Sequence, residues 1–256
     1  MAIKLKDAIS LNENEIISLV GGGGKTTLLF WLARELCPQG VVLTTTTKMK
    51  YPLVSVPLVY WEDRHQVQAE VKTMLLLKRS PFVANGLLPQ QQKIQGLNLD
   101  QMRELAELKL ATTIVIEADG AKGRSLKGYR HFEPVLTPLT TLLIQVVGAD
   151  IIGKKLSDQF VHCPEKIAEG TGLQLEVPLD IEAISSALLY PYDAWQKYLV
   201  SARKVVVINK VDTIKEAEPA KLLAMKLIKS RRVDKVLLTV ADCGQVLQVY
   251  DQGDVL

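Results

Sequence analysis

The stretch SLVGGGGKTTLL, residues 18–29, indicates the class of fold, because it has the form of a phosphate-binding loop. An apolar run leads into four glycines, and Lys25, Thr26 and Thr27 follow at the start of a second apolar run. Glycines let successive backbone N–H groups turn toward an anion, and the helix that follows adds its positive end. We expect Lys25 to contact the outer phosphates, the Thr26 hydroxyl to bind Mg²⁺ and Thr27 to contact an inner phosphate. The predicted nucleotide-binding residues of this loop are Gly21, Gly22, Gly23, Gly24, Lys25, Thr26 and Thr27.

The loop departs from the commonest pattern, G-x-x-x-x-G-K-[ST], which would place a glycine at Leu19. It is similar to the variant K-G-G-x-G-K-T-[TS] of the ParA/MinD branch of P-loop proteins, except that Val20 replaces the first lysine. In that branch the lysine reaches the partner's phosphates across a dimer, so we do not expect that contact here. The alternative interpretation is a glycine-rich turn without a ligand.

The rest of the chain alternates apolar strands with helices. Predicted strands cover residues 15–20, 40–48, 111–120, 140–148, 204–212 and 235–241. Predicted helices cover residues 25–37, 63–79, 98–109, 180–189 and 217–232, with Asn98 or Asp100 capping the third. Continuous Val, Ile and Leu runs favour a sheet covered on both faces, and intervening helices favour parallel crossovers. We predict a single α/β domain over residues 1–256, P-loop NTPase-like, with a doubly wound, mostly parallel sheet and ligands beyond its carboxyl ends.

A second motif, TIVIEADGAKGRSLKGYR (residues 113–130), carries carboxylates at the end of a predicted strand. P-loop enzymes need a carboxylate there to hold Mg²⁺ or its waters opposite the loop threonine. Glu117 resembles the glutamate of the metallochaperone GTPases, which precedes x-x-G, and Asp119 is the rival carboxylate. Gly120 would let the backbone approach the γ-phosphate. The predicted catalytic residues are Lys25, Glu117 and Asp119, and the predicted metal ligands are Thr26 and Glu117.

Two further groups could contact phosphate or substrate. Lys122, Arg124 and Lys127 follow the acidic strand end, where cations could neutralise phosphate charge or hold an anionic substrate. The alternative for them is a solvated basic loop. Thr46 and Thr47 lie at the end of the second predicted strand and could contact the γ-phosphate or a metal-bound water, or could be present only for their β propensity.

A third motif, VVVINKVD, ends in Asn209, Lys210, Val211 and Asp212 and matches the N-K-x-D pattern of GTP-binding proteins. Its carboxylate accepts two hydrogen bonds from guanine, a donor pair that adenine lacks. Lys210 would pack along the base and Asn209 would brace the loop. We therefore predict GTP as the ligand, with ATP left open and a surface turn as the alternative.

Composition limits the other classes of function. The net charge of +3 is too small to argue for nucleic acid, and no apolar run approaches the ~18–20 residues of a membrane span. The N-terminus lacks a secretory signal, and the cysteines, Cys37, Cys163 and Cys243, form neither a disulfide framework nor a zinc pattern, so we expect a cytoplasmic protein. The adjacent His162 and Cys163 suggest a soft-metal or selenium ligand, although two neighbours alone make a poor metal site.

Taken together, LVGGGGKTTL, VVLTTTTKM, IEADGAKGRSLKGY and VVINKVD resemble the YqeC family over roughly residues 10–215. Its members are described as accessory proteins for selenium-dependent molybdenum hydroxylases. The resemblance implies a role in enzyme maturation, with a molybdenum hydroxylase or its maturation factors as partner. The favoured hypothesis is a Mg²⁺-dependent nucleotide hydrolase or switch. A kinase for a small anionic metabolite and a non-catalytic nucleotide-binding scaffold are the alternatives, and the oligomeric state is left open.

Overall fold

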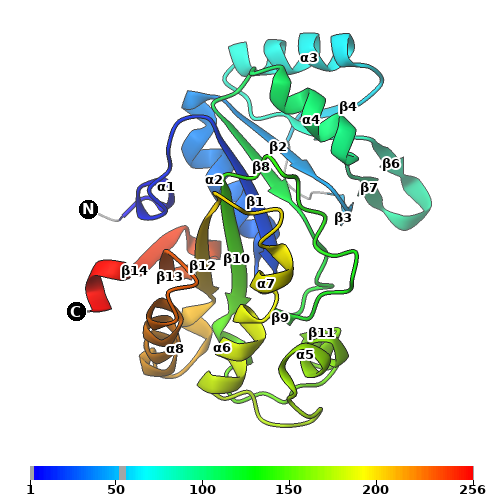
Figure 1. The fold of residues 1–256 in the computed structure, drawn as a ribbon. Helices are drawn as coiled ribbons and strands as arrows, with labels where there is room; N and C mark the ends of the chain where they lie inside the picture. The colour runs from blue at the N-terminus through cyan, green and yellow to red at the C-terminus, as the bar shows by residue number, and fades with distance from the viewer. Residues whose placement is uncertain (1–2, 52–55, 256) are drawn as a thin grey trace.

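The computed structural model describes residues 3–51 and 56–255, so the ends of the predicted domain, residues 1–2 and 256, lie outside it. Within the described residues a nine-stranded sheet crosses the molecule (Figure 1). Its strand order is β14 (Gln245–Asp251), β13 (Lys235–Val240), β12 (Arg203–Asn209), β10 (Leu142–Gly148), β1 (Glu15–Gly21), β8 (Thr113–Glu117), β2 (Val41–Thr45), β5 (Phe82–Ala84) and β4 (Leu58–Tyr60). Neighbouring strands pair in parallel, except β14 with β13. The predicted α/β fold with a mostly parallel, doubly wound sheet is confirmed.

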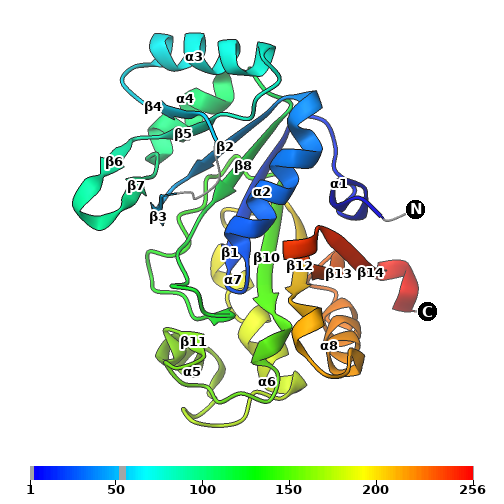
Figure 2. The ribbon, with the colours of Figure 1, turned by 180° about the vertical axis from the view of Figure 1, so that it is seen from behind.

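Helices cover both faces of the sheet, as the opposite views of Figures 1 and 2 show. One face carries α1 (Leu5–Ala8) and α2 (Lys25–Leu36), and the other carries α3 (Arg64–Leu76), α4 (Leu99–Glu107), α6 (Ile181–Leu189), α7 (Tyr192–Trp195) and α8 (Glu218–Lys229). The apolar side chains accordingly form two clusters, one on each side of the sheet. On the first, Leu28 and Leu32 of α2 share a cluster with Ile17 and Leu19 of β1. Because helices cover both faces of the sheet, side chains on both faces of each strand can be apolar, which explains the continuous apolar runs in the sequence.

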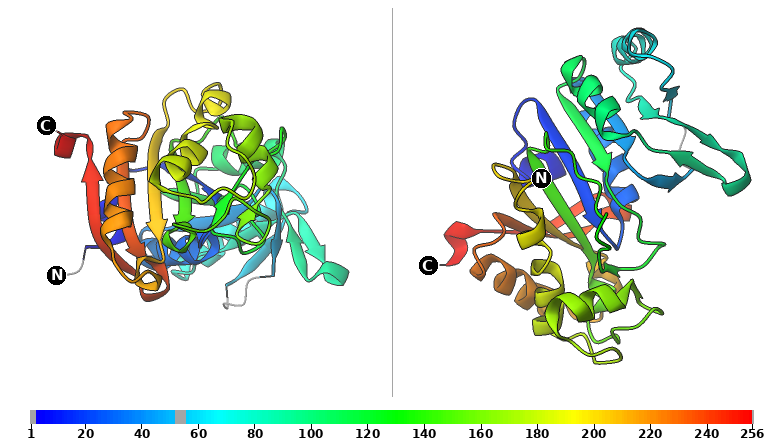
Figure 3. Two further views of the ribbon diagram at one scale, coloured as in Figure 1. Left: turned by 90° about the horizontal axis from the view of Figure 1, so that it is seen from below. Right: turned by 45° about the vertical axis from the view of Figure 1, so that its right-hand side comes forward.

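Besides the four-residue helices α1 and α7, several elements were not predicted, most of them because they are too short to show periodicity; β14, with seven residues, and α5 (Pro164–Thr171), with eight, are the exceptions. These further elements are β4, β5, β14, β3 (Lys48–Lys50), β6 (Gly86–Leu88), β7 (Lys93–Gln95), β9 (Leu126–Lys127), β11 (Val161–His162) and the helix α5. β3, β7 and β6 form a small antiparallel sheet, and the hairpin of β6 and β7 projects from the molecule in both views of Figure 3. The third predicted helix is capped by Asn98, in a capping box with Gln101, and not by Asp100.

Three predicted strands end three residues earlier than expected, and each end lies at the same edge of the sheet. β2 stops at Thr45, β8 at Glu117 and β12 at Asn209, where the next residue adopts a left-handed conformation. In the register of the sheet, Leu19 and Thr45 both pair with Glu117, and Gly148 pairs with Asn209. β1 lies between β8 and β10, which come later in the chain, so the glycine loop follows a strand inside the sheet, at its carboxyl edge, where doubly wound sheets bind ligands.

Candidate functional site

The glycine loop presents a group of free backbone donors at the start of α2. Gly24 occupies the N-cap position and has no side chain to accept a hydrogen bond. Across residues 3–51 and 56–255, no protein acceptor lies within hydrogen-bond range of the N–H groups of Gly24, Lys25, Thr26 or Thr27. The first N–H groups of a helix have no intrahelical partner and carry its partial positive charge. The geometry therefore suits an anion at this helix start.

The preceding glycines are held by protein contacts. Gly22 N–H donates to Val146 O and Gly23 N–H donates to Arg124 O, both at 2.9 Å. A Cβ on Gly22 would lie 2.4 Å from the same Arg124 carbonyl, and one on Gly23 would lie 2.3 Å from Gly148 N. Glycine is therefore required at these two positions for the loop to pack against its neighbours.

Glu117 lies opposite the start of α2, where it contacts Thr26. The Thr26 hydroxyl donates to Glu117 Oε2 at 2.8 Å, and the carboxylate is buried. Burial raises the pKa of Glu117, while Lys25 and the Thr26 hydroxyl oppose that shift. One hydroxyl and one carboxylate, completed by phosphate oxygens and water, make a donor set that suits Mg²⁺. No group of three or more His, Cys, Asp or Glu side chains lies together as a metal site among the described residues.

Asp119, the rival carboxylate, has different partners. It is fully buried, its Oδ1 lies 2.9 Å from Lys25 Nζ and its Oδ2 accepts a hydrogen bond from Gly21 N–H at 2.9 Å. Lys25 Nζ also donates to Gly21 O. The two carboxylates that the sequence could not distinguish thus separate: Glu117 faces the threonine, and Asp119 holds the lysine.

The structure does not bring the three cations after the strand together. Lys122 and Arg124 are exposed, whereas Lys127 is buried. Lys127 Nζ donates to Gly120 O at 2.6 Å and to Glu133 Oε1 at 2.9 Å, and it lies 3.6 Å from Asp119 Oδ2. Lys127 is therefore part of a buried ion-pair chain and not of a solvated basic loop. At Gly120 a Cβ would meet nothing within 4 Å, so space is open there.

Of the two threonines after β2, Thr46 binds a backbone carbonyl and Thr47 lies beside another threonine hydroxyl. The Thr46 hydroxyl donates to Val135 O at 2.8 Å, and the Thr47 hydroxyl lies 3.4 Å from that of Thr45. Thr45, which the sequence did not single out, donates to the backbone oxygen of Glu117 at 2.7 Å. The Thr46 N–H donates to the same oxygen at 3.2 Å, so two neighbouring threonines join the end of β2 to the acidic strand end. No sequence signal marked Thr45, because the predicted strand continued to residue 48.

Asn209 joins the N-K-x-D motif to the glycine loop. Its Nδ2 donates to Gly23 O at 2.8 Å, and its Oδ1 accepts from Ala241 N–H at 2.8 Å and from the Thr239 hydroxyl at 3.1 Å. Asn209 is buried, and its amide group joins the loop after β1 to the chain after β13. Three elements are thus held by one side chain.

Lys210 and Asp212 follow Asn209 in the N-K-x-D motif. Lys210 has a left-handed backbone conformation, and its Nζ donates to Ser125 Oγ at 2.9 Å and to Asp150 Oδ2 at 3.1 Å. Ser125 and Asp150 carried no sequence signal, because only the fold places them beside the motif. The Asp212 side chain is exposed. It is therefore free to accept hydrogen bonds from a base edge.

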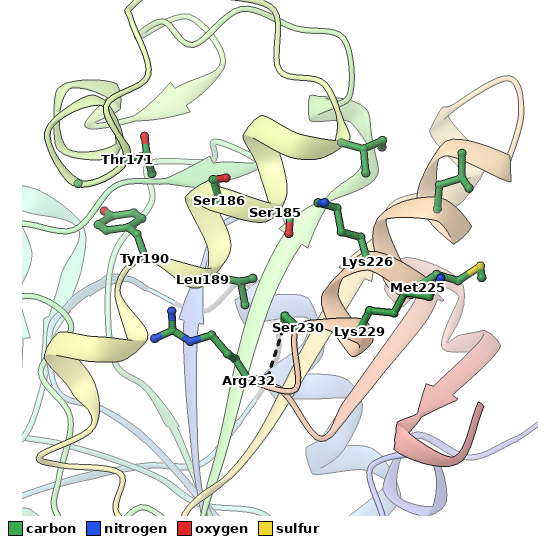
Figure 4. A pocket seen from close by; sticks show the side chains of 13 residues that line it. Thr171, Ser185, Ser186, Leu189, Tyr190, Met225, Lys226, Lys229, Ser230 and Arg232 are labelled. Carbon is green, nitrogen blue, oxygen red and sulfur yellow. Dashed lines mark hydrogen bonds between the residues drawn. The ribbon is translucent and has the colours of Figure 1, made fainter. Parts of the chain in front are cut away.

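Other candidate features lie apart from this site. Burial raises the pKa of the Cys163 thiol and lowers that of His162, and the two side chains are 3.7 Å apart at the start of α5. A cavity of about 910 Å³ lies between α5, α6 and α8, with Ser185, Lys226 and Arg232 among its lining (Figure 4). None of the residues predicted to bind nucleotide lines it. Within residues 3–51 and 56–255 no helix has the length and apolar character of a membrane span.

Comparison with known proteins places the chain in a family. A family model described as "YqeC protein" matches residues 17–165, more than half of the chain. The chain is 32% identical over 204 residues to a curated protein of Escherichia coli (strain K12) named "Uncharacterized protein YqeC". That alignment covers 79% of this chain and 78% of the relative. The family model spans the glycine loop and Glu117 but ends before the N-K-x-D motif.

Proposed function

The chain belongs to the YqeC family, and we propose that it is a Mg²⁺-dependent guanine-nucleotide hydrolase or switch. The observation that carries the proposal is the convergence of three sequence motifs at one edge of the sheet. Glu117 reaches the loop through Thr26, and Asn209 reaches it through Gly23, although both lie far from it in sequence. If the three motifs matched their patterns only by chance, they would not be expected to lie together and to be joined by hydrogen bonds.

Each residue has a role that its geometry supports. The backbone N–H groups of Gly24 to Thr27 would bind phosphate oxygens, and the Lys25 ammonium would add charge there. Thr26 and Glu117 would hold Mg²⁺, which when bound neutralises charge on the transferred phosphate. Asp212 would accept hydrogen bonds from guanine, while Asn209 keeps the loop in place.

The kinase alternative has less support. It requires Lys122, Arg124 and Lys127 to form one site for an anionic acceptor molecule. Lys127 is buried in ion pairs, and these would have to break before it could join the two exposed cations. The described residues also present no side chain in an obvious position to activate an attacking water. We therefore expect slow intrinsic GTP hydrolysis, raised by a partner protein.

The deciding experiment measures GTP and ATP binding to the wild type and to Asp212→Asn. Hydrogen bonds to a charged acceptor contribute ~1.5–3 kcal/mol each, so the substitution should weaken GTP binding at least about tenfold and leave ATP unchanged. Xanthine has a carbonyl where guanine has its 2-amino group, so xanthosine triphosphate should gain affinity in the variant. ATP binding that exceeds GTP binding and is unaffected by the substitution would refute the guanine assignment.

The cellular role we propose, assistance in maturing a selenium-dependent molybdenum hydroxylase, rests on the resemblance to the family. Its test replaces the chromosomal gene with a Lys25→Ala variant and measures hydroxylase activity in extracts. We expect normal hydroxylase protein with reduced activity. Unchanged activity in a strain whose Lys25→Ala protein no longer binds nucleotide would refute this role.

A further inference from the structure

The loop lysine, Lys25, is engaged in a buried ion pair with Asp119. Lys25 Nζ contacts Asp119 Oδ1 and the Gly21 carbonyl, and only 5% of the lysine is exposed. A phosphate bound at the start of α2 would attract the same ammonium. Phosphate and Asp119 therefore compete for one cation.

Asp119 would then be a buried carboxylate that has lost its nearest cation. An unpaired buried charge is strongly destabilising, so nucleotide binding would be opposed unless another cation is present. Lys127 is that cation, because its Nζ lies 3.6 Å from Asp119 Oδ2 and its side chain is inaccessible to solvent. Glu133 and the Gly120 carbonyl hold Lys127 there at hydrogen-bond distance.

We propose that Lys127 is a positioning residue that stabilises Asp119 when Lys25 turns to the phosphates, and that Asp119 restrains Lys25 until then. This inference rests on the proposed nucleotide binding. The four charges Lys25, Asp119, Lys127 and Glu133 alternate in sign along this series of contacts. When the Lys25 ammonium turns to a phosphate, Asp119 therefore remains paired with Lys127. Lys127 acts through Asp119 and touches no ligand itself.

A double-mutant cycle on nucleotide affinity tests the proposal. The probe is a fluorescent GDP or GTP analogue with Mg²⁺, titrated into the wild type, Asp119→Asn, Lys127→Met and the double variant. Asp119→Asn keeps an acceptor for Gly21 N–H but releases Lys25, so affinity should rise about tenfold, or ~1.4 kcal/mol. Lys127→Met should lower affinity at least about tenfold in the wild type and by less than about threefold in the Asp119→Asn background.

The controls separate positioning from a merely structural role. Lys127→Arg should restore most of the affinity, and thermal unfolding checks that each variant is folded. Lys155→Met, which removes a lysine from an exposed ion pair with Glu176, should not change affinity. A folded Asp119→Asn variant that binds nucleotide more weakly than the wild type would overturn the proposal, as would an equal loss from Lys127→Met in both backgrounds. A wild type that binds neither GTP nor ATP would instead refute the proposed function.

Discussion

The Asn209 side chain offers the sharpest test of how the glycine loop is held. Asn209→Ala removes the donor to Gly23 O and the acceptor of Ala241 N–H, both at 2.8 Å in a buried position. The Thr239 hydroxyl can rotate toward another acceptor, so its lost bond counts for less. Two buried backbone groups are left without partners, at ~1–3 kcal/mol each, which gives a central value of about 4 kcal/mol.

The assay is thermal unfolding, followed by circular dichroism without nucleotide. For a chain of this size 1 kcal/mol corresponds to a Tm change of ~2–4 °C, so Asn209→Ala should lower the Tm by roughly 8–16 °C. Asp212→Ala is the matched control, because it changes an exposed side chain after the same strand and should shift the Tm by no more than about 2 °C. A Tm for Asn209→Ala within about 2 °C of the wild type, or an equal fall in the control, would refute the bracing role.

Two further predictions concern the charge and the glycines of the site. Burial raises the pKa of Glu117, so its contribution to stability is present below the unfolded-state pKa of about 4.3 and is lost as the pH rises through the folded pKa. In metal-free buffer, the Tm of the wild type should therefore fall relative to that of Glu117→Gln as the pH rises above the unfolded-state pKa of about 4.3. Parallel Tm curves for the two proteins would contradict this. Gly22→Ala should destabilise the fold, because its Cβ would lie 2.4 Å from Arg124 O, whereas Gly120→Ala has open space and should leave the Tm unchanged. Chemical denaturation of both variants measures the difference, and equal stability would show that the loop adapts to a side chain at position 22.

The class of fold could be predicted because its signals are local. β1, β8, β10 and β12 are rich in Val, Ile and Leu, and three of the helices between them, α3, α4 and α6, begin with a side-chain cap. Residues 58–60 and 82–84 could not be recognised as strands, because three residues cannot show a period. Residues 82–84 pair with β2 and residues 58–60 pair with β5, so each of these strands depends on hydrogen bonds from a partner strand.

The sequence by itself determined the glycine loop, the carboxylates at and just after the end of β8 and the N-K-x-D motif, since residue type and spacing define each of them. Only the tertiary structure decided which carboxylate faces Thr26, and that Lys127 belongs to a buried chain of charges while Lys122 stays in solvent. The bond from Asn209 to Gly23 joins residues 186 positions apart. The physical reason is that backbone conformation and apolar periodicity follow from neighbouring residues, whereas the energy of a charge depends on burial and on partners that only the folded chain brings to it.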